Sequence, residues 1–490
     1  MKKVASGVVP VLAVDRSAAE PLHRQIYDGY RGAIVNGTLR AGQKIPSTRT
    51  LAKDLGVSRI PVLNAYSQLL AEGYFESRVG SGTVVTKSLP DQVVPSPRGR
   101  RPVKLRSGPR PVSVRCASLD RIPRGPWLRG WGPFGVSQVA FEHFPFQVWS
   151  SLVTRHSRNP TAKTLDYGSP MGLKDLRESI AEYLRTARGV RCDAEQIMVV
   201  SGSQQALEIA AHVLFDPGNK IWLEEPGYKF ARDLFRMAGC QVVPVPIDYE
   251  GMDVSAGIKR SRNARAAFVS PSHQYPLGVT MSASRRLQLL EWAQNSGAWI
   301  IEDDYDSEYR YASLPIASLQ GLDTNSRVIY IGTFSKVLFP SLRLGYLVVP
   351  PDLIDQFVTA RWSMDLCPPT FSQAVLADFI REGHFARHIR RMRQLYSERR
   401  SALLECIRKE LGFTVDITGG QAGMHMTLTM PKGTDDRGIS VRAASKNLWL
   451  APLSSSYVGK PLRHGFILGF GSTSVEEMPE AVRKLRSLLT

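Results

Sequence analysis

The stretch IGTFSKVLFPSLRLGY, residues 331–346, decides the fold of the larger part of this chain. Small and polar residues surround Lys336 directly after a β-rich run, and Arg343 follows it in the same stretch. A lysine placed this way is suited to covalent chemistry with an aldehyde, such as that of pyridoxal phosphate (PLP). The stretch therefore predicts a cofactor-binding lysine in an α/β domain.

PLP needs three further supports, namely a phosphate cradle, an anion near the pyridinium nitrogen and a plane over the ring. QIMVVSGSQQALEIAAHVL predicts a strand, a tight turn and a helix, and it puts Ser203 and Gln204 at a helix N-terminus, where backbone amides hold phosphate. GAWIIEDDYD ends a predicted buried strand with Asp303, and Tyr305 follows within reach of the cofactor's phenolic oxygen. In EEPGYK, Tyr228 is placed to stack on the pyridine ring.

Each of these residues also has an ordinary structural interpretation, since Tyr228 can pack in a core and Asp303 can cap a helix. Their occurrence together with Thr333, Lys336 and Arg343 favours the cofactor site. From about residue 116 to the end, short β-rich runs alternate with longer helical patterns, which is typical of an α/β sheet with crossover helices. The runs are QIMVVSG, NKIWLEE, ARAAFVS, GAWIIEDD and SRVIYIG.

The composition excludes several other classes of protein. The chain of 490 residues is 43% hydrophobic, and no apolar run is long enough to span a membrane. Its five cysteines have neither metal-binding nor redox spacing, so we expect no metal site, no disulfide framework and a cytoplasmic location. The net charge is +19, and residues 1–113 carry 18 Lys/Arg against 7 Asp/Glu. Such a concentration of charge favours a polyanionic partner, although a solvated basic surface is the alternative.

The N-terminal residues 12–86 have the pattern of a helix-turn-helix followed by a glycine-rich hairpin. Leu22, Ile26, Tyr30 and Ile34 form one apolar stripe at a spacing of four residues. KIPSTRTLAKDLGVSRIPVLNAYSQLL then predicts two short helices around a turn, and ESRVGSGTVV predicts a wing. The alternative is a purely structural helical subdomain with a basic face. Residues 87–115 are rich in proline and arginine and predict an extended basic linker.

Residues 20–86 resemble the winged helix-turn-helix of the GntR family of bacterial regulators. The resemblance rests on Pro46-Ser47-Thr48-Arg49, Gly56-Val57-Ser58-Arg59 and Gly80-Ser81-Gly82-Thr83. It implies that Arg49 and Arg59 reach double-stranded DNA and that the wing with Gly82 approaches the minor groove. Ser47 and Ser58 stand at helix N-termini, where hydroxyls and amides hold phosphates. Pro61 departs from the family, which usually has threonine there.

The region from about 135 to 490 resembles the class I/II aminotransferases of PLP fold type I. By resemblance, Lys336 is the Schiff-base lysine, Asp303 the pyridinium partner and Tyr228 the stacking aromatic. The same resemblance places Tyr305 on the phenolic oxygen and assigns a phosphate cup to Ser203, Gln204, Thr333 and Arg343. It also implies a head-to-tail homodimer, in which Tyr167 reaches the phosphate of the neighbouring subunit.

Fused in this order, the two halves are similar to the MocR subfamily of GntR regulators, on the motifs SPSHQYPLG, IEDDYDSEYRY and GTFSK. The expected fold is a winged helix-turn-helix at 12–86, a flexible basic linker at 87–115 and an α/β aminotransferase-like domain at 116–490. The expected function is PLP-dependent regulation of transcription, with PLP, an amine or an amino acid as effector.

Two departures bear on whether the aminotransferase-like domain is still an enzyme. Tyr275 stands before Pro276 where aminotransferases usually have an asparagine that touches the cofactor's phenolic oxygen, and His273 and Gln274 nearby are candidate substitutes for it. Ile467 stands near the position of the arginine that clamps a substrate carboxylate in enzymes of this class, and Arg463 lies close in sequence. Loss of a bidentate clamp favours a regulator with weak or vestigial activity. A catalytically active aminotransferase with a DNA-binding extension remains the alternative.

Overall fold

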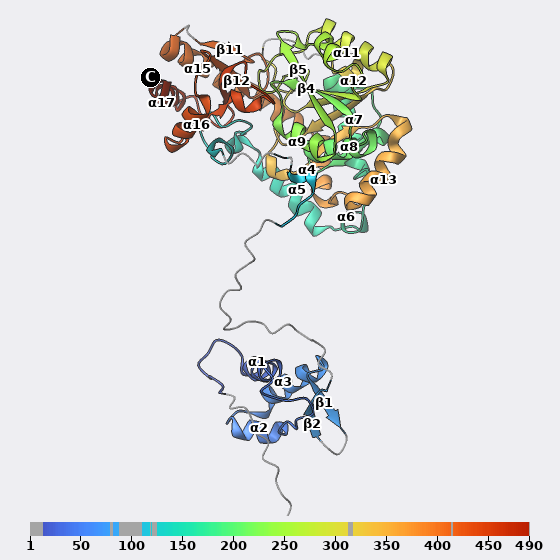
Figure 1. Ribbon diagram of the computed structural model, residues 1–490, viewed down its shortest axis with the longest axis vertical. Helices are drawn as coiled ribbons and strands as arrows, with labels where there is room; N and C mark the ends of the chain where they lie inside the picture. The colour runs from blue at the N-terminus through green and yellow to red at the C-terminus, as the bar shows by residue number, and fades with distance from the viewer. Residues whose placement is uncertain are drawn as a thin grey trace, which may run out of the picture. The chain divides into compact units, whose positions relative to one another are not determined.

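The computed structural model describes residues 13–78, 82–87, 110–117, 119, 125–311, 317–412 and 415–489. The chain divides between Arg110 and Pro111 into two compact units (Figure 1). Most of the predicted linker at 87–115 lies outside the described residues.

The N-terminal unit is three helices and an antiparallel strand pair, as the sequence predicts. Its elements are α1 (Leu22–Val35), α2 (Thr48–Asp54), α3 (Arg59–Ala71), β1 (Phe75–Arg78) and β2 (Gly82–Val85). Tyr30, Tyr66 and Phe75 meet edge to face at the centre of its core, with ring centroids 5.2–5.7 Å apart. α2 and α3 enclose the turn at Gly56, so this unit is a winged helix-turn-helix with β1 and β2 as the described part of the wing.

The C-terminal unit is built on a large mixed sheet. Within the described residues its strand order is β3-β10-β9-β8-β7-β4-β5-β6. Strands β9, β8, β7, β4 and β5 are mutually parallel, whereas β10 runs antiparallel to both of its neighbours, β3 and β9. The bounds are β3 (Ile197–Val200), β4 (Lys220–Glu225), β5 (Gln241–Asp248), β6 (Gly251–Met252), β7 (Ala266–Val269), β8 (Trp299–Asp304), β9 (Val328–Thr333) and β10 (Gly345–Val348).

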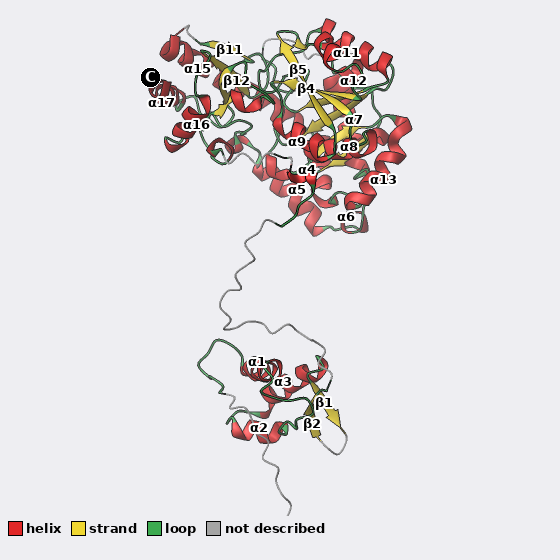
Figure 2. Ribbon diagram, in the orientation of Figure 1, coloured by secondary structure: helices red, strands yellow, loops and turns green. Residues whose placement is uncertain are grey.

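Helices cover both faces of this sheet (Figure 2). Alternate residues of one strand point to opposite faces, so Ile329 and Ile331 join one hydrophobic cluster while Val328 and Tyr330 join clusters on the other face. This burial on two sides explains why the strands read as continuous apolar runs. The helices of this part are α4 (Val114–Ala117), α5 (Phe146–Arg158), α6 (Ala162–Leu165), α7 (Lys174–Arg188), α8 (Ser203–Leu214), α9 (Lys229–Met237), α10 (Val254–Arg260), α11 (Ala283–Ser296), α12 (Leu319–Leu322), α13 (Ile354–Asp365) and α14 (Thr370–Arg381).

A smaller antiparallel sheet, of order β11-β12-β14-β13, closes the C-terminal end of the chain. The long helix α15 (His384–Leu411) leads into it, and α17 packs against α15. The remaining bounds are β11 (Asp416–Thr418), β12 (His425–Met430), α16 (Asp436–Ser445), β13 (Ala451–Pro452), β14 (His464–Gly469) and α17 (Met478–Leu489). In the described residues we find no helix that is both long and apolar enough to cross a membrane.

Candidate functional site

Lys336 lies just beyond the carboxyl end of β9, in the connection that leads to β10. Thr333 ends the strand, and its Oγ1 accepts a hydrogen bond from the Ser335 amide at 3.2 Å. Arg343 closes the connection in a left-handed conformation with φ of 50°, and one of its terminal nitrogens donates to the Ser201 carbonyl oxygen at 2.6 Å. The segment that carries the lysine is thereby tied at both ends.

A cavity of about 680 Å³ opens at the carboxyl ends of the parallel strands, where α/β folds usually bind ligands. The structure brings eight of the nine predicted cofactor residues to its wall. They are Ser203, Gln204, Tyr228, Asp303, Tyr305, Thr333, Lys336 and Arg343. These residues come from separate connections, and the parallel sheet gathers them because its carboxyl ends share one edge.

The N-terminus of α8 forms one wall of this cavity. Ser203 and Gln204 begin the helix, whose first-turn amides have no acceptor within the helix itself. Gly202 precedes them with φ of 97°, and a β-carbon there would approach a terminal nitrogen of Arg343 to 3.0 Å. Backbone amides and the guanidinium of Arg343 therefore converge on a place suited to a phosphate group.

The carboxyl group of Asp303 lines the cavity, and one of its oxygens lacks a hydrogen-bond partner among the described residues. The residue is 6% exposed, and among the described residues no hydrogen-bond partner contacts its Oδ1. Burial raises the pKa of Asp303 to about 7, and the nearby Asp304 and Asp306 add to the increase. A buried carboxylate oxygen without a partner is costly, so a ligand that brings an N–H group here would satisfy it.

Lys336 carries an amine whose pKa is below its usual range. Burial lowers the pKa of Lys336 to about 8, which the positive charge of Arg343 also favours, whereas Asp306 and Asp303 oppose the shift. A larger share of this lysine than of an ordinary one is thus neutral near physiological pH, as a nucleophilic amine requires.

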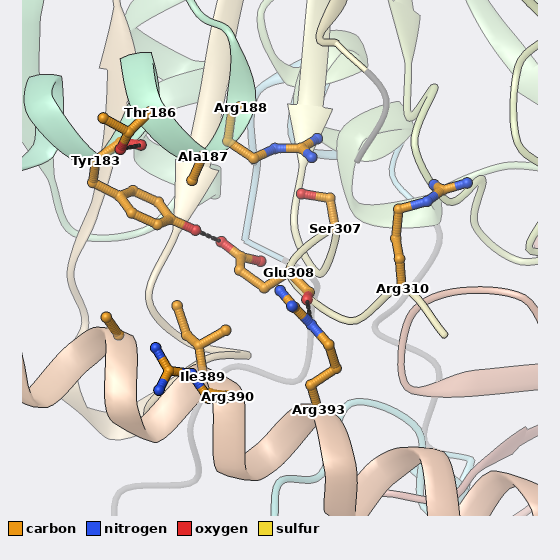
Figure 3. A pocket seen from close by; sticks show the side chains of 11 residues that line it. Tyr183, Thr186, Ala187, Arg188, Ser307, Glu308, Arg310, Ile389, Arg390 and Arg393 are labelled. Carbon is orange, nitrogen blue, oxygen red and sulfur yellow. Dashed lines mark hydrogen bonds between the residues drawn. The ribbon is translucent and has the colours of Figure 1, made fainter. Parts of the chain in front are cut away.

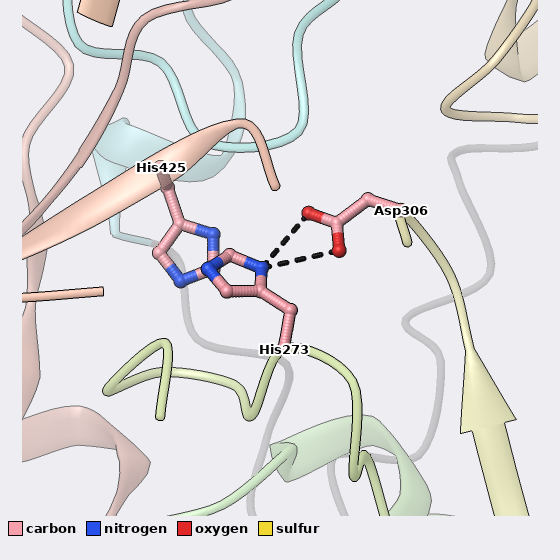
Figure 4. Close-up of side chains that lie close together, drawn as sticks. All are labelled: His273, Asp306 and His425. Carbon is pink, nitrogen blue, oxygen red and sulfur yellow. Dashed lines mark hydrogen bonds and ion pairs between the residues drawn. The ribbon is translucent and has the colours of Figure 1, made fainter. Parts of the chain in front are cut away.

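Tyr305 adjoins a buried polar cluster of His273, Asp306 and His425 (Figure 4). Nδ1 of His273 lies 3.1 Å from both oxygens of Asp306 and 3.2 Å from the hydroxyl of Tyr305. His425 Nε2 lies 3.0 Å from the Pro276 carbonyl, and burial lowers the pKa of His425 well below its ordinary value. The cluster holds the hydroxyl of Tyr305 in place through His273.

Gln274 and Tyr275 take different positions around this cavity. The Gln274 amide donates to Glu224 and to the Pro226 carbonyl, at 3.2 and 3.0 Å, and Gln274 is not among the residues that line the cavity. Tyr275 lines the cavity and meets Tyr228 edge to face, with ring centroids 5.9 Å apart. Tyr228 also accepts a 3.3 Å hydrogen bond from Gln204. Of the two neighbours that the sequence offered as substitutes for asparagine, His273 is the one that contacts Tyr305.

Arg129 lines the cavity from the segment before α5, together with Trp127 and Trp131, and no sequence motif had pointed to it. The available signal was the run GPWLRGWG, a basic residue among aromatics close to the start of the domain. No sequence motif pointed to Glu224 either, a buried residue that contacts Gln274 and is not among the residues that line the cavity. Burial raises the pKa of this carboxyl to about 8, and its Oε1 has no partner among the described residues.

Tyr167 is the one predicted cofactor residue outside this cavity. It lies between α6 and α7 and is 81% exposed. Its place on the surface leaves its hydroxyl available to a second subunit.

In the N-terminal unit, four of the five predicted DNA-binding residues lie at the starts of α2 and α3, and the fifth, Gly82, begins β2. Ser47 caps α2 by accepting a hydrogen bond from the Thr50 amide, and Ser58 is the N-cap residue of α3. Arg59 donates from Nε to the Thr48 hydroxyl at 3.1 Å, which links the two helices. Ser47, Arg49, Ser58, Arg59 and Gly82 are all exposed. Such a surface of two helix N-termini and two arginines has the composition of a phosphate-binding surface.

Each half of the chain matches a known protein family. Residues 22–85 match the model of bacterial regulatory proteins of the gntR family, and residues 133–466 match that of aminotransferase class I and II. The chain is 41% identical to the probable rhizopine catabolism regulatory protein MocR of Rhizobium meliloti, over 97% of this chain and 95% of that one. The chain belongs to the MocR-type regulators of the GntR family. It is 32% identical to the pyridoxine biosynthesis regulator PdxR of Corynebacterium glutamicum, over 91% of each chain.

Among solved structures, the MocR-type chain resembles a kynurenine aminotransferase of Pyrococcus horikoshii. The TM-score is 0.71 and the identity 28%, over 77% of this chain and 96% of that one. The fold predicted from the sequence is thus confirmed, and the chain is a PLP-dependent transcriptional regulator. Its own residues fit the cofactor, because the α8 N-terminus, the unsatisfied oxygen of Asp303 and the ring of Tyr228 supply the three supports that PLP needs beside the amine of Lys336.

Proposed function

We propose that the aminotransferase-like domain of this MocR-type regulator is a sensor that reports PLP, or a small amine or amino acid, to the DNA-binding unit. One observation carries the proposal. Eight of the nine predicted cofactor residues line one cavity, while Ile467, near the expected position of the carboxylate clamp, is an apolar residue fully buried in β14. Arg463 is exposed and is not among the residues that line the cavity. A domain that keeps its cofactor residues but lacks this clamp is better suited to recognition than to turnover.

In this proposal each residue of the cavity has one role toward PLP, which supplies an amine-reactive aldehyde and an electron-withdrawing ring. Lys336 binds the aldehyde, and Asp303 accepts a hydrogen bond from the ring nitrogen. Tyr305, held by His273, donates to the phenolic oxygen, and Tyr228 stacks on the ring. Ser203, Gln204, Thr333 and Arg343 hold the phosphate.

The effector would occupy the part of the cavity that the cofactor leaves open. Among the described lining residues, the positive side chains are Arg129, Lys336 and Arg343. Because the last two are assigned to the cofactor, Arg129 is available for an effector's carboxylate.

Assembly and location belong to the same proposal. The regulator acts in the cytoplasm as a head-to-tail homodimer, in which the exposed Tyr167 of each subunit reaches the phosphate site of its partner. Residues 12–86 bind operator DNA through Ser47, Arg49, Ser58, Arg59 and Gly82, residues 87–115 link them to the sensor, and residues 116–490 form it. An effector changes DNA binding only if it prefers one conformation of the sensor over another.

A working aminotransferase is the second candidate, and the lowered pKa of Lys336 favours it, since a partly neutral lysine is what transamination needs. Incubation of the PLP-loaded protein with amino donors and keto acceptors separates the two candidates. Sustained product formation over many turnovers would replace the sensor by the enzyme.

The first experiment is binding of labelled DNA from the gene's own upstream region, with and without PLP, for wild type and Lys336→Ala. We expect PLP to change the affinity or stoichiometry of the wild type only. Sequence-specific DNA binding whose affinity and stoichiometry are the same with and without PLP, in both proteins, would exclude PLP alone as the signal. A complete lack of specific binding would contradict the regulator proposal for this DNA.

A further inference from the structure

A second cavity, of about 330 Å³, lies between the C-terminal end of α7, the segment that follows β8 and the first turns of α15 (Figure 3). It has no lining residue in common with the cofactor cavity. Its volume is at the lower end of the range for small-molecule sites. None of the roles argued above uses it.

Positive side chains dominate the wall of this second cavity. Arg188 and Arg310 reach it from the sheet side, and Arg390 and Arg393 reach it from α15. Glu308 is the carboxylate among the lining residues. Arg393 is anchored through Nε to the Glu308 carbonyl oxygen at 2.9 Å, so its two terminal nitrogens remain for a ligand. Arg188 is paired with Asp304 and Arg310 donates to the Ser272 carbonyl, so Arg390 and Arg393 are the two guanidinium groups proposed for the ligand. Two guanidinium groups suit an oxyanion, which they bind through paired hydrogen bonds.

Ser307 supplies an independent indication of a ligand. The residue is 4% exposed and lines the cavity, and its hydroxyl has no hydrogen-bond partner among the described residues. A buried hydroxyl without a partner is unfavourable unless something else satisfies it. An oxyanion in the cavity would accept a hydrogen bond from Ser307 and complete the arginine contacts at the same time.

We propose that this cavity is a second ligand site of the regulator, for a small metabolite that carries a phosphate or carboxylate group. The ligand contacts the terminal nitrogens of Arg390 and Arg393 and the hydroxyl of Ser307. The shared chemistry is that of an oxyanion, and the test below separates phosphate from carboxylate.

Glu308 makes this site sensitive to pH. Tyr183 of α7 donates a 2.9 Å hydrogen bond to its Oε1. Burial raises the pKa of Glu308 to about 7, the negative charge of Asp304 adds to this, and Arg188 opposes it. Arg390 and Arg393 of α15 and the neighbouring Arg310 are the other charged groups that line the cavity. Below its pKa the carboxyl is neutral and no longer repels an anion, so the binding of a carboxylate ligand such as succinate, which keeps its charge in this range, strengthens as the pH falls through about 7.

One short segment connects this site to the cofactor cavity. Residues 305–310 begin at Tyr305 in the cofactor cavity and continue to Ser307, Glu308 and Arg310 in the second cavity. In parallel, Arg188 contacts Asp304 from Nε at 2.9 Å and from a terminal nitrogen at 2.7 Å, and Asp304 directly follows Asp303. A ligand that contacts Ser307 therefore acts on Tyr305, and one that contacts Arg188 acts on Asp303 through Asp304. Tyr305 and Asp303 are the residues proposed to bind the cofactor's ring. This coupling, unlike the binding itself, rests on the proposed function.

The test is calorimetric titration of the full-length, PLP-loaded protein with inorganic phosphate and, separately, with succinate. PLP loading keeps phosphate out of the cofactor's own phosphate site. The variants are Arg390→Gln, Arg393→Gln and the milder Ser307→Ala. Arg408→Gln, on the same helix but outside this cavity, is the control. We expect at least one of the two anions to bind, and each arginine variant to weaken binding by about tenfold or more.

Three results would overturn the proposal. The first is that neither anion binds, and the second is that the variants bind as tightly as Arg408→Gln. The third is that Arg390→Gln and Arg393→Gln weaken DNA binding without any anion site being present, which would assign the arginines to the duplex. Circular dichroism verifies that each variant is folded, and Ser307→Ala keeps the test valid if an arginine variant is not.

Coupling has its own readout, the absorbance of the bound cofactor during the titration. A shift of the absorbance band on anion binding, absent in Ser307→Ala, is the expected result, and binding without any shift would overturn the coupling. If the protein takes up no PLP, the sensor proposal fails by itself. The arginine variants then still report on the second cavity when compared with wild type in the PLP-free protein.

Discussion

Asp303 and Lys336 face one cavity from adjacent parallel strands, Asp303 within β8 and Lys336 just after β9, and their charges shift each other's pKa. The buried carboxylate favours the charged lysine, while burial favours the neutral one. Burial prevails, so the pKa of Lys336 is lowered to about 8.

The first prediction concerns the pH dependence of PLP uptake. Only the neutral amine reacts with the aldehyde, so the rate should rise with pH below about 8 and level off above it. An unperturbed lysine would continue to gain rate until about pH 10.4. Stopped-flow absorbance of the PLP-free protein mixed with PLP measures this profile. Lys336→Ala is the control, because it forms no covalent absorbance band. A rate of PLP uptake that still rises steeply above about pH 9.5 would contradict the prediction.

The second prediction tests Asp303 as the partner of the ring nitrogen. Asp303→Asn keeps the shape of the side chain but removes its charge, so PLP should bind about tenfold more weakly or worse, as expected for one charge-assisted hydrogen bond. Asp355→Asn, at an exposed position on α13, should leave the affinity unchanged. Titration of the PLP-free proteins, followed by absorbance, measures both. Equal affinities would remove Asp303 from the cofactor site.

The third prediction concerns the buried ion pair next to the site. Arg188 and Asp304 are 4% and 6% exposed, and Tyr330 donates a further 2.5 Å hydrogen bond to Asp304. Asp304→Asn leaves the buried guanidinium without its counter-charge, which should destabilise the domain by about 3 kcal/mol.

The exposed pair Lys174–Glu178 provides the control for that measurement. Glu178→Gln should cost less than about 0.5 kcal/mol, because an exposed pair on a helix surface is weak. Urea unfolding, followed by near-ultraviolet circular dichroism of the C-terminal unit, compares the two. A midpoint for Asp304→Asn close to that of Glu178→Gln would show that the buried pair contributes little.

The fourth prediction addresses DNA recognition. Arg59→Gln and Arg49→Gln should each weaken operator binding, because each removes a positive charge that can neutralise a phosphate. For each arginine that binds a phosphate, its replacement should reduce the slope of log affinity against log salt by about 1. Arg24→Gln, an exposed position on α1 paired with Asp28, is the matched control. Binding isotherms at several salt concentrations give both quantities. An unchanged slope and affinity in Arg49→Gln and Arg59→Gln would place the DNA surface elsewhere.

Local patterns explain how much of this architecture was predictable. The spacing of Leu22, Ile26, Tyr30 and Ile34 predicted an apolar stripe. The last three residues are buried in the core of the N-terminal unit, and Leu22 is half-buried. The run around Lys336 predicted a strand end, and β9 ends at Thr333. In both cases the residues that carry the signal lie within a few positions of each other, so periodicity and turn chemistry suffice to find them.

Contacts between distant segments were beyond such signals. Arg129 reaches the cofactor cavity, and Arg393 reaches Glu308, only because the fold brings separate elements together. His425, at the start of β12 in the small sheet, lies against His273, which follows β7 of the large sheet. Their ring centroids are 4.5 Å apart. No spacing within one segment encodes these pairs.

The last prediction tests the head-to-tail dimer through Tyr167, which is 81% exposed in the single chain. If its hydroxyl binds the phosphate held by the partner, Tyr167→Phe should weaken PLP binding by about tenfold. Mixing this variant with Lys336→Ala distinguishes an interaction between subunits from one within a chain. A mixed dimer then contains one site with both defects and one site with an intact lysine and an intact tyrosine. We therefore expect covalent PLP uptake with wild-type affinity at up to half of the sites in the mixed dimer. Neither variant alone shows such uptake. If mixing restores nothing while sedimentation confirms that the subunits exchange, Tyr167 does not serve the neighbouring site.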